Sequence, residues 1–452
     1  MFVGVGILAS AAGATTYIQF NAPGIGSGGF VVELNDNTPL HRDNFLRYVN
    51  GGLYVNQIIH RSDDANQVIQ GGGFALSDDP DYLLQYVPVL DPPVTYEGNL
   101  GWSNTLYTLG AARTADPNSA TNQWYINMGD NSAGFDDQPG TPGYTVFGRL
   151  VGGYTTADAI YAMPVWNAAS FFGSNAFSTL PLLPTFDING PLEQEHFVTL
   201  PTTQVITGGS WLGAAGTPWQ TPGNWSCYMA PIAAFTTTFD AATVSQPALT
   251  QAESVKQVRF VTAGWTISGG ANVLTVGDGG IVSTPATDSN AISAAVTAGA
   301  SANWTVNNTL TLSGTLNLAG KTITKDGGGT LVVSGTQNHA ASSVLNANAG
   351  NVVFNTDAGG TAHNKNLTVN VNGNAAVSLN STEYLAGLNV NTGSATLAAG
   401  GTKVLVTNAL TVDTTDSSLD ITNNRLIVDY APADANPSQQ IQNLVRTGYN
   451  RG

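Results

Sequence analysis

The stretch from Ala112 to Met128 carries side chains whose types and spacing could form a binding surface. It reads ARTADPNSATNQWYINM, in which loop-forming residues separate two short apolar runs, so the pattern predicts strand, loop and strand. Because side chains alternate across a strand, Gln123 and Tyr125 would share one face, and Trp124 and Ile126 the other. One face can therefore join a core, while the face with an amide and a phenol is free for a site.

Other groups of chemically active side chains have weaker spacing. Two acidic groups could bind calcium, but neither has the spacing of a calcium loop, and solvated loops are the favoured interpretation. The first group is Asp78, Asp79 and Asp81, and the second is Asp130, Asn131, Asp136 and Asp137. The five His and one Cys lack zinc-type spacing, and no helix follows Gly71–Gly73 to form a phosphate cradle. We therefore expect no metal and no cofactor.

The composition favours β structure in two or three domains. A chain of 452 residues exceeds one ordinary domain. Only 10% of the residues are charged and 52 are glycine, so good helix formers are scarce. The net charge of −16 argues against a nucleic-acid partner, because the chain has no basic footprint. Its single cysteine, Cys227, cannot form an internal disulfide.

The first fourteen residues, MFVGVGILASAAGA, bear on location. They are apolar or small and end in the Ala-x-Ala pattern of a secretory cleavage site, although they lack a basic start. They are too short to span a bilayer. We interpret residues 1–14 as the remnant of a signal peptide, which predicts an exported protein at the cell surface, in the periplasm or outside the cell. The alternative is a buried or disordered N-terminal strand.

Two strands and two helices would help to position the site. The runs YIQFNA and GGFVVELNDN alternate as strands do. The run TPLHRDNFLRYVNGG predicts a helix that Thr38 could cap, that Pro39 could begin and that Gly51 would end. A second helix is predicted to start near Thr155, with Asp158 completing a capping box.

Five blocks of sequence, in the right order, resemble the cyclophilin-type peptidyl-prolyl isomerases. They are DNFLRYV, IIHR, VIQGGGF, the run from ARTADPNSA to NQWYIN, and GYTVFGRLVGGYTTADAI. The resemblance covers residues 15–206. It implies a closed antiparallel β-barrel of eight strands with two helices, in which HFVTL at 196–200 would be the last strand. Closure would remove exposed strand edges.

The resemblance also implies which residues would act on a prolyl peptide. Rotation about the prolyl bond meets a barrier of about 18–20 kcal/mol from amide resonance. The Arg61 guanidinium would donate to the prolyl nitrogen and draw its lone pair out of that resonance. Gln70 and Gln123 would hold the substrate backbone, and Ala112 and Arg113 would line the groove beside it. The walls of the proline pocket would be Tyr125, Phe135 and Tyr144, and its floor would be Val68 or Gln67. Expected partners are proline-containing polypeptides and a cyclosporin-like ligand.

The chain departs from the family pattern around this site. One extra residue separates Arg61 from Gln70, and SDDANQV replaces an apolar run that contains a phenylalanine. Ala111 and Asp136 stand where methionine and leucine are frequent. Such changes to smaller or polar groups would weaken the contact with the proline ring by about 1–3 kcal/mol.

These departures leave two functions open. The first is an exported prolyl isomerase. The second is a catalytically weak or inactive binding or assembly module of a structural cell-surface or matrix protein. The acidic residues after Arg61 favour the second, because Asp63 or Asp64 could pair with the guanidinium, whereas Arg61, Gln70 and Gln123 together favour the enzyme.

From residue 207 the composition changes to Asn, Thr, Gly, Ala, Val and Leu. Short alternating runs recur at intervals of roughly 10–25 residues, which is typical of stacked strands. WLGAAGTPWQTPGNWS and KDGGGTLVVSG resemble the autotransporter-associated β-helix repeats of large bacterial surface proteins. We predict a parallel β-helix over 207–430, with a pair of β-sandwich domains as the alternative. Trp211, Trp219 and Trp225 would cap its open end or form a sugar-binding platform.

Residues 431–452 are predicted to form a linker and a short C-terminal helix. The helix would run from Ser438 to Arg446 and end at Gly448. Such endings are similar to those of multidomain surface proteins of planctomycete-like bacteria. The β-helix would then display or anchor the first domain, with cell-surface or self-assembly partners of its own.

Overall fold

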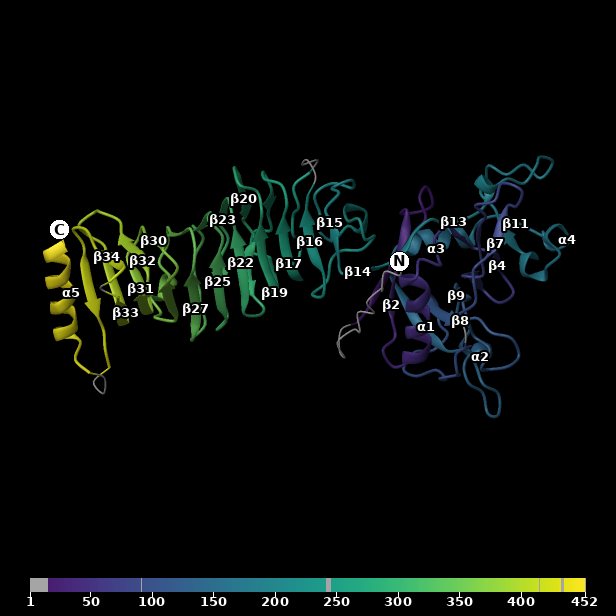
Figure 1. Cartoon of the computed structure of the whole chain (residues 1–452), viewed down its shortest axis with the longest axis horizontal. Coiled ribbons are helices and arrows are strands. Elements are labelled where there is room, and N and C mark those ends of the chain that lie inside the picture. The colour runs from purple at the N-terminus through teal and green to yellow at the C-terminus, as the bar shows by residue number, and fades with distance from the viewer. Residues whose placement is uncertain (1–14, 91, 241–244, 414, 432–434, 452) are drawn as a thin grey trace, which may run out of the picture. The chain divides into compact units, whose positions relative to one another are not determined.

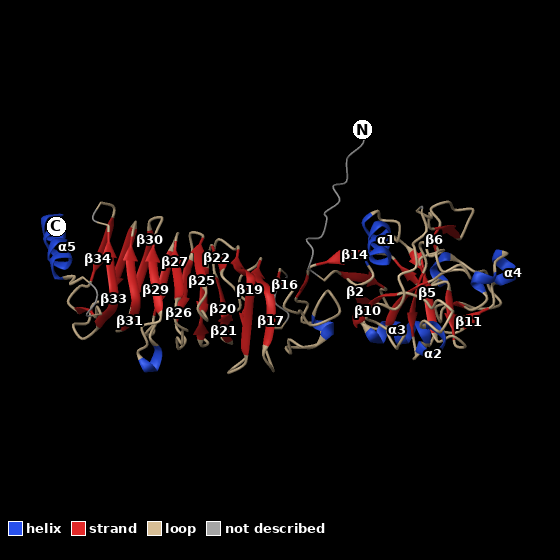
Figure 2. Cartoon of the chain, turned by 90° about the horizontal axis from the view of Figure 1, so that it is seen from below, coloured by secondary structure: helices blue, strands red, loops and turns tan. Residues whose placement is uncertain are grey.

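The computed structural model describes residues 15–90, 92–240, 245–413, 415–431 and 435–451. The chain divides into two compact units, one comprising residues 1–207 with 227–229 and the other 208–226 with 230–452. Both units are mainly β, and the described residues include five α-helices (Figure 2). The proposed signal-peptide remnant, residues 1–14, lies outside the described part of the chain.

Eight strands of the first unit form one antiparallel sheet. They are β1 (Tyr17–Asn21), β2 (Gly29–Leu34), β4 (Arg61–Asp63), β5 (Val68–Gly71), β8 (Thr108–Ala111), β9 (Trp124–Asn127), β10 (Val146–Gly152) and β14 (Thr203–Ile206). Their order in the sheet is β14-β1-β2-β10-β8-β9-β5-β4. Successive strands in this order are hydrogen-bonded neighbours. Figure 1 labels β2, β4, β8, β9 and β14 among them.

A second sheet closes the first one into a barrel. It contains β3 (Gln57–Ile58), β6 (Phe74–Leu76), β7 (Leu84–Tyr86) and β13 (Thr199–Leu200), in the order β13-β3-β6-β7. Because β3 leads directly into β4 and β13 leads into β14, the pairing of β3 with β13 joins the two outer strands. The closed barrel predicted from the sequence is confirmed. The strand that completes it on β1 is β14, so the prediction of 196–200 as the last strand was wrong.

The triple glycine makes room for large side chains of the neighbouring segment, one on each face of the sheet. A Cβ on Gly71 would lie 2.6 Å from the Trp124 ring, and one on Gly73 would lie 2.9 Å from the side-chain amide of Gln123. Trp124 and Ile126 belong to the barrel core, as their alternation predicted. The glycine run therefore serves the packing of the strand that carries the candidate site.

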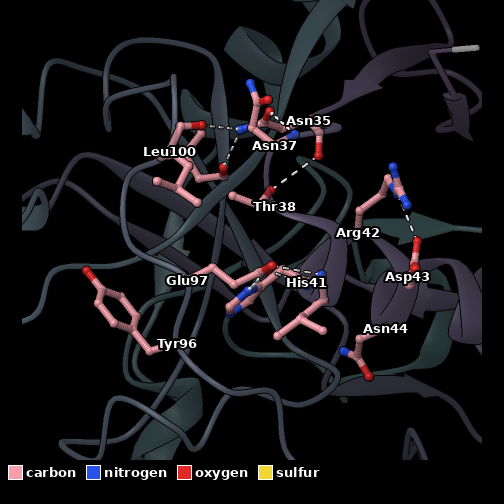
Figure 3. A network of polar contacts seen from close by, with 12 residues as sticks. Asn35, Asn37, Thr38, His41, Arg42, Asp43, Asn44, Tyr96, Glu97 and Leu100 are labelled. Atoms are coloured by element: carbon pink, nitrogen blue, oxygen red, sulfur yellow. Dashed lines mark hydrogen bonds and ion pairs between the residues drawn. The ribbon is translucent and has the colours of Figure 1, made fainter. Parts of the chain in front are cut away.

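Helix α1 (Pro39–Asn50) is capped by a residue far away in the sequence. Thr38, the predicted cap, makes no side-chain bond into the helix, because its hydroxyl donates to the backbone carbonyl of Asn35, which precedes the helix. The Glu97 carboxylate instead accepts hydrogen bonds from the N–H groups of Leu40 (2.9 Å) and His41 (2.8 Å) (Figure 3). A carboxylate at a helix N-terminus satisfies free N–H groups and complements the helix dipole.

We expect Glu97→Ala to lower the free energy of unfolding of the first unit by about 1 kcal/mol, because two helix N–H groups lose their acceptor. Glu97→Gln should cost less, since its amide oxygen can still accept. Urea unfolding followed by tryptophan fluorescence measures both. Asp43→Ala is the control, because the Asp43 side chain on the same helix is 62% exposed. Equal losses in the Glu97 and Asp43 alanine variants would argue against the cap.

Helix α3 (Tyr154–Tyr161) also begins without the predicted cap. Gly153 precedes it in the left-handed region with φ of 73°, and as a glycine it has no side chain that could cap the first turn. A Cβ on Gly153 would lie 2.1 Å from a carbonyl oxygen of β2, so only glycine fits there. The Asp158 carboxylate accepts a hydrogen bond from the Tyr107 hydroxyl at 2.8 Å, so the predicted capping box was wrong.

The remaining elements of the first unit are short. They are α2 (Ser132–Phe135), β11 (Val165–Trp166), α4 (Ala169–Phe172), η1 (Asn175–Phe177), β12 (Leu180–Pro181) and η2 (Gln194–His196). Strands β11 and β12 pair with each other, and their neighbourhood holds a second, smaller cluster of buried apolar side chains.

The second unit is a parallel β-solenoid of about nine turns. One sheet contains β15 (Gly208–Ser210), β16 (Thr236–Phe239), β17 (Glu253–Phe260), β19 (Val273–Ser283), β21 (Ala295–Ala298), β22 (Ala302–Val306), β24 (Leu316–Asn317), β25 (Thr322–Asp326), β27 (Ser343–Ala347), β29 (Leu367–Val371), β31 (Glu383–Val390), β33 (Val404–Val412) and β35 (Arg425–Val428). The other contains β18 (Thr266–Ile267), β20 (Ser289–Ile292), β23 (Thr309–Leu312), β26 (Thr330–Val333), β28 (Asn351–Phe354), β30 (Ala375–Leu379), β32 (Gly393–Leu397) and β34 (Ser417–Asp420). The short helices η3 (Pro222–Asn224) and η4 (Gly360–Ala362) lie between strands.

Every strand pair between the solenoid strands is parallel, as between β28 and β30. This pairing confirms the predicted β-helix and excludes the alternative of two antiparallel β-sandwich domains.

Polar ladders explain the unusual composition of the solenoid. Asn370 donates to the side-chain oxygen of Asn346, and Asn389 donates to that of Asn370, both at 2.7 Å. Thr324 and Thr411 extend this row at its two ends. Stacked amides satisfy one another without charge, which is why the region needs few charged residues.

The three tryptophans that open the solenoid are core residues. Trp211, Trp219 and Trp225 are at most 1% exposed, and their rings contact one another edge-on or stacked. Trp219 and Trp225 also contact Phe239 in the next part of the core. A sugar-binding platform needs exposed ring faces, so this interpretation was wrong.

Glu383 is a buried acid within the solenoid. Its carboxylate accepts hydrogen bonds from the Ala358 N–H (2.8 Å) and the Ser381 hydroxyl (2.6 Å), but burial raises its pKa to about 8. Because the folded state holds the Glu383 proton more tightly than the unfolded chain does, this contribution to stability is fully present below about pH 4.5 and is lost as the pH rises through about 8.

We therefore expect the free energy of unfolding of the second unit to fall between about pH 5 and pH 9, and to fall less in Glu383→Gln. Urea unfolding at a series of pH values measures the slope. Glu253→Gln, a change at a half-buried position of β17, is the matched control and should keep the wild-type slope. An unchanged slope in Glu383→Gln would contradict this account.

The C-terminal helix is longer than predicted. Helix α5 runs from Ser438 to Arg451 and continues through Gly448, which was predicted to end it. A glycine inside an exposed helix costs only about 1 kcal/mol, so it need not end the helix. Among the described residues, no helix combines the length and the hydropathy needed to cross a membrane.

Candidate active site

A row of four residues crosses the barrel sheet at the candidate site. Arg61 on β4 lies opposite Gln70 on β5, Gln70 lies opposite Tyr125 on β9, and Tyr125 lies opposite Gly110 on β8. Directly opposed residues share a face of a sheet, so this row sets the two polar groups beside an aromatic ring. A Cβ on Gly110 would lie 2.2 Å from the Tyr125 ring, so glycine at this position lets the ring lie across the neighbouring strand.

Side-chain amides connect the cation to the next strand. The Arg61 Nη1 donates to Gln70 Oε1 at 3.4 Å, and Gln70 Nε2 donates to Gln123 Oε1 at 2.8 Å. The Ala112 N–H donates to the backbone carbonyl of Gln123 at 3.0 Å, which joins this end of β8 to β9. Four residues predicted for one site therefore lie along one hydrogen-bonded chain.

Three aromatic rings form the second part of the site. Tyr125 meets Phe135 and Tyr144 edge-on, with ring centroids 5.7 Å and 6.0 Å apart, and Phe135 lies 5.0 Å from Tyr144. The Arg113 guanidinium lies 4.4 Å over the Tyr144 ring and donates to the backbone carbonyl of Gly143 at 2.8 Å. Arg113 thus fastens the loop that carries Tyr144, and the rings form an apolar wall beside the polar row.

Val68 lies on the same face of β5 as Gln70, because the two residues are separated by one position. Val68 is buried and lies opposite Asn127 on β9. Gln67, the other residue predicted for the pocket floor, has a positive φ of 47°, and its carbonyl accepts the Met128 N–H at 2.7 Å. Gln67 therefore belongs to the turn, and Val68 is the apolar residue on the site's face.

The Arg61 guanidinium forms an ion pair with Asp63. Asp63 Oδ1 also accepts the N–H groups of Ala65 (2.9 Å) and Asn66 (3.2 Å), so one carboxylate organises the turn after Arg61. Burial alone would raise the pKa of Asp63, but hydrogen bonds from Asn66 and the charge of Arg61 lower it. The side chains of Arg61 and Asp63 are 35% and 12% exposed. Of the two acids that could pair with Arg61, Asp63 is the one that does.

His60 lies beneath this row and is 1% exposed. Its ring is 5.0 Å from that of Phe74 and meets it edge-on. Burial, with the charge of Arg61, lowers the pKa of His60 to about 3, against a smaller opposing effect of a hydrogen bond with Gln123. His60 is therefore a neutral packing residue at ordinary pH.

The acidic residues considered for calcium bind neighbouring protein groups. Asp136 accepts the N–H and side-chain amide of Asn104 at 2.8 and 2.9 Å, and Asp137 accepts the N–H of Gly143 at 2.8 Å. Asp130 accepts the hydroxyl of Ser132 at 2.6 Å. Within the described residues, no group of three His, Cys, Asp or Glu side chains could hold a metal ion.

Sequence reasoning missed the residues that support the site from behind. The Asn104 side chain accepts a hydrogen bond from the Tyr125 hydroxyl, and the Asp136 carboxylate accepts one from the Asn104 amide. Both lie in stretches with no periodic pattern, where a polar side chain that bonds inward is indistinguishable from a solvated one. In the sequence, Asp136 stood out as a departure from the family's usual leucine and as a member of an acidic group considered for calcium, and neither observation indicates this supporting role.

Comparison with known proteins agrees with this geometry. The family described as cyclophilin type peptidyl-prolyl cis-trans isomerase matches residues 17–171. The peptidyl-prolyl cis-trans isomerase cyp18 of Streptomyces antibioticus is 43% identical over 138 residues, which is 30% of this chain and 78% of the relative. Peptidyl-prolyl cis-trans isomerase B of Escherichia coli is 37% identical over 138 residues, which is 29% of this chain and 78% of the relative.

A solved structure of a Cryptosporidium parvum cyclophilin type isomerase covers 42% of this chain and 98% of its own, with 17% identity and a TM-score of 0.28. The two relatives show the family, because the chain spans 78% of the length of each at 43% and 37% identity. The chain therefore belongs to the family of cyclophilin-type peptidyl-prolyl cis-trans isomerases, with a β-solenoid fused after the isomerase domain.

Proposed function

We propose that the first unit isomerises X-Pro bonds in exported polypeptides, with Arg61 as the catalytic donor. The reaction needs no nucleophile, because only rotation about a partial double bond is catalysed. It needs an apolar contact for the proline ring and a donor that favours the twisted amide over the planar one. The opposed row of Arg61, Gln70 and Tyr125 across three strands is the observation that carries the proposal.

Each part of the site has a separate task in this mechanism. The rings of Tyr125, Phe135 and Tyr144 receive the prolyl ring. Gln70 and Gln123 bind the flanking backbone, since each amide carries both a donor and an acceptor. When the amide twists, its nitrogen regains a lone pair that can accept a hydrogen bond from Arg61, so this bond is stronger in the transition state than in the ground state.

The test uses the full chain and a tetrapeptide with one X-Pro bond, with cis-to-trans exchange measured by NMR. We expect exchange faster than the uncatalysed rate and blocked by a cyclosporin-like ligand. Exchange at the uncatalysed rate in a folded sample would refute the proposal.

A second candidate function is favoured by the ion pair of Arg61 with Asp63. A guanidinium held by a carboxylate in a half-exposed position is a weaker donor, so the domain could bind prolyl segments in a surface or matrix assembly without useful turnover. Peptide binding without accelerated exchange would identify this function.

Export and surface display remain part of the proposal. The Ala-x-Ala pattern at residues 12–14 supports cleavage after Ala14, and the solenoid offers a long polar body for display or self-assembly. Expression with residues 1–14 in a bacterium, followed by N-terminal sequencing of the exported protein, should give a chain beginning at Thr15. A protein that keeps Met1 and stays in the cell extract would argue against export.

The activity should be independent of pH near neutrality. Because the pKa of His60 is lowered to about 3, we expect kcat/KM for the tetrapeptide to stay constant between about pH 5 and pH 8. An unperturbed histidine would give a change near pH 6.5. NMR exchange rates across this range make the measurement. A step near pH 6.5 that disappears in His60→Gln would show that His60 titrates during catalysis.

A further inference from the structure

Asn104 is a buried amide at the back of the aromatic wall. It is 0% exposed, although it lies in the loop between β7 and β8. Its side-chain Oδ1 accepts the Tyr125 hydroxyl at 2.6 Å, and its Nδ2 donates to the backbone carbonyls of Phe135 (3.2 Å) and Tyr144 (3.0 Å). One side chain therefore bonds to all three residues that form the wall.

The same residue also holds α2, the short helix in the loop between β9 and β10 that carries Phe135 and Tyr144. Its backbone carbonyl accepts the Asn131 N–H at 2.9 Å, and its own N–H and side-chain amide both bond to Asp136 Oδ1. The Ser103 hydroxyl binds the other oxygen of Asp136. Helix α2, between Asn131 and Asp136, is only one turn long, so these bonds fix its two ends from outside.

A further link leads to the turn after Arg61. Asn131 Nδ2 donates to the backbone carbonyl of Asn66 at 2.7 Å and to Asn127 Oδ1 at 2.7 Å. Asn127 in turn donates to Asn104 Oδ1 at 3.2 Å. The aromatic wall and the turn that carries Asp63 are thus connected through two buried or half-buried asparagines.

We propose that Asn104 is a positioning residue for the proline pocket. This inference rests on the proposed function. It touches no reacting atom. It acts by holding the Tyr125 ring and the carbonyls of Phe135 and Tyr144 at fixed separations, so that the pocket keeps its shape before the peptide arrives. A pocket that must be ordered by the peptide binds it less tightly, and this cost falls on ground state and transition state alike.

The experiment compares Asn104→Ala with Asn35→Ala in the full chain. Asn35 is the matched control, because it is 2% exposed and its Nδ2 bonds to the carbonyls of Leu100 (3.0 Å) and Val146 (3.2 Å), near α1 (Figure 3). Both variants should lose stability. Only Asn104→Ala should raise KM for the tetrapeptide, by about tenfold, with kcat within about twofold of wild type.

Binding of the same tetrapeptide, measured by NMR titration, keeps this inference separate from the proposed function. If wild type binds the peptide without catalysing exchange, the proposed function fails, but a roughly tenfold weaker Kd in Asn104→Ala still supports the positioning role. Should Asn104→Ala not fold, Asn104→Asp keeps the acceptor for Tyr125 and removes both donors to the loop, and the same rise in KM or Kd is expected. An unchanged KM and Kd in a folded Asn104 variant, or an equal change in Asn35→Ala, would overturn the inference.

Discussion

Arg61→Ala should lower kcat/KM for a prolyl tetrapeptide by about 100-fold or more, since a donor that acts on the transition state contributes about 3 kcal/mol or more. Gln70 lies opposite Arg61 in the sheet and accepts a hydrogen bond from its Nη1, so the proposed donor lies beside a proposed backbone-binding residue. The loss should fall on kcat, because the prolyl nitrogen becomes a good acceptor only when the amide twists. NMR exchange on the full chain measures both constants.

Two further variants make this result specific. Arg61→Lys keeps the charge but not the planar fork, so it should recover only part of the lost activity. Arg149→Ala removes a cation from β10 of the same barrel, where it binds Glu33 and is 50% exposed, and it should leave kcat/KM unchanged. Full activity in Arg61→Ala would mean that the twisted amide is stabilised by another group.

Local alternation in the sequence predicted which residues of the strand at 124–127 join the core. Gln123 and Tyr125 were separated from Trp124 and Ile126 by period two alone, and the structure places the latter pair in the core. The same rule predicted the stacked strands of the solenoid, because each short strand buries alternate residues. Elements defined by a repeating pattern were predictable because burial of one face determines them.

Contacts between distant segments were not predictable in this way. Glu97 caps α1 across 56 residues, and Thr38, which has the right type and position for a cap, does not bond to the helix. Asn104 reaches Tyr125 from a loop, and nothing in its neighbours distinguishes it from a solvated asparagine. In each case the hydrogen-bond partner depends on which polar group lies nearby once the barrel has closed. A single sequence does not show which distant residues become neighbours.

Asp63→Asn should raise kcat/KM by up to about fivefold. In the native turn the Asp63 carboxylate holds the Arg61 guanidinium, so a substrate nitrogen has to compete with a full negative charge for the same donor. Ion pairs at partly exposed positions contribute up to about 1 kcal/mol, which sets the size of the expected gain. Asparagine retains an oxygen that can accept the N–H groups of Ala65 and Asn66, so the turn itself should persist.

Asp64→Asn is the control for the change in net charge. Asp64 is the next residue and is exposed, its hydrogen bond is with the Tyr161 hydroxyl, and Arg61 pairs with Asp63 instead. Its neutralisation should leave kcat/KM close to wild type. A fall in activity in a folded Asp63→Asn variant would instead show that the carboxylate orients Arg61 for catalysis. A gain confined to Asp63→Asn would mean that one carboxylate decides how far this barrel works as an isomerase and how far it works as a binding module.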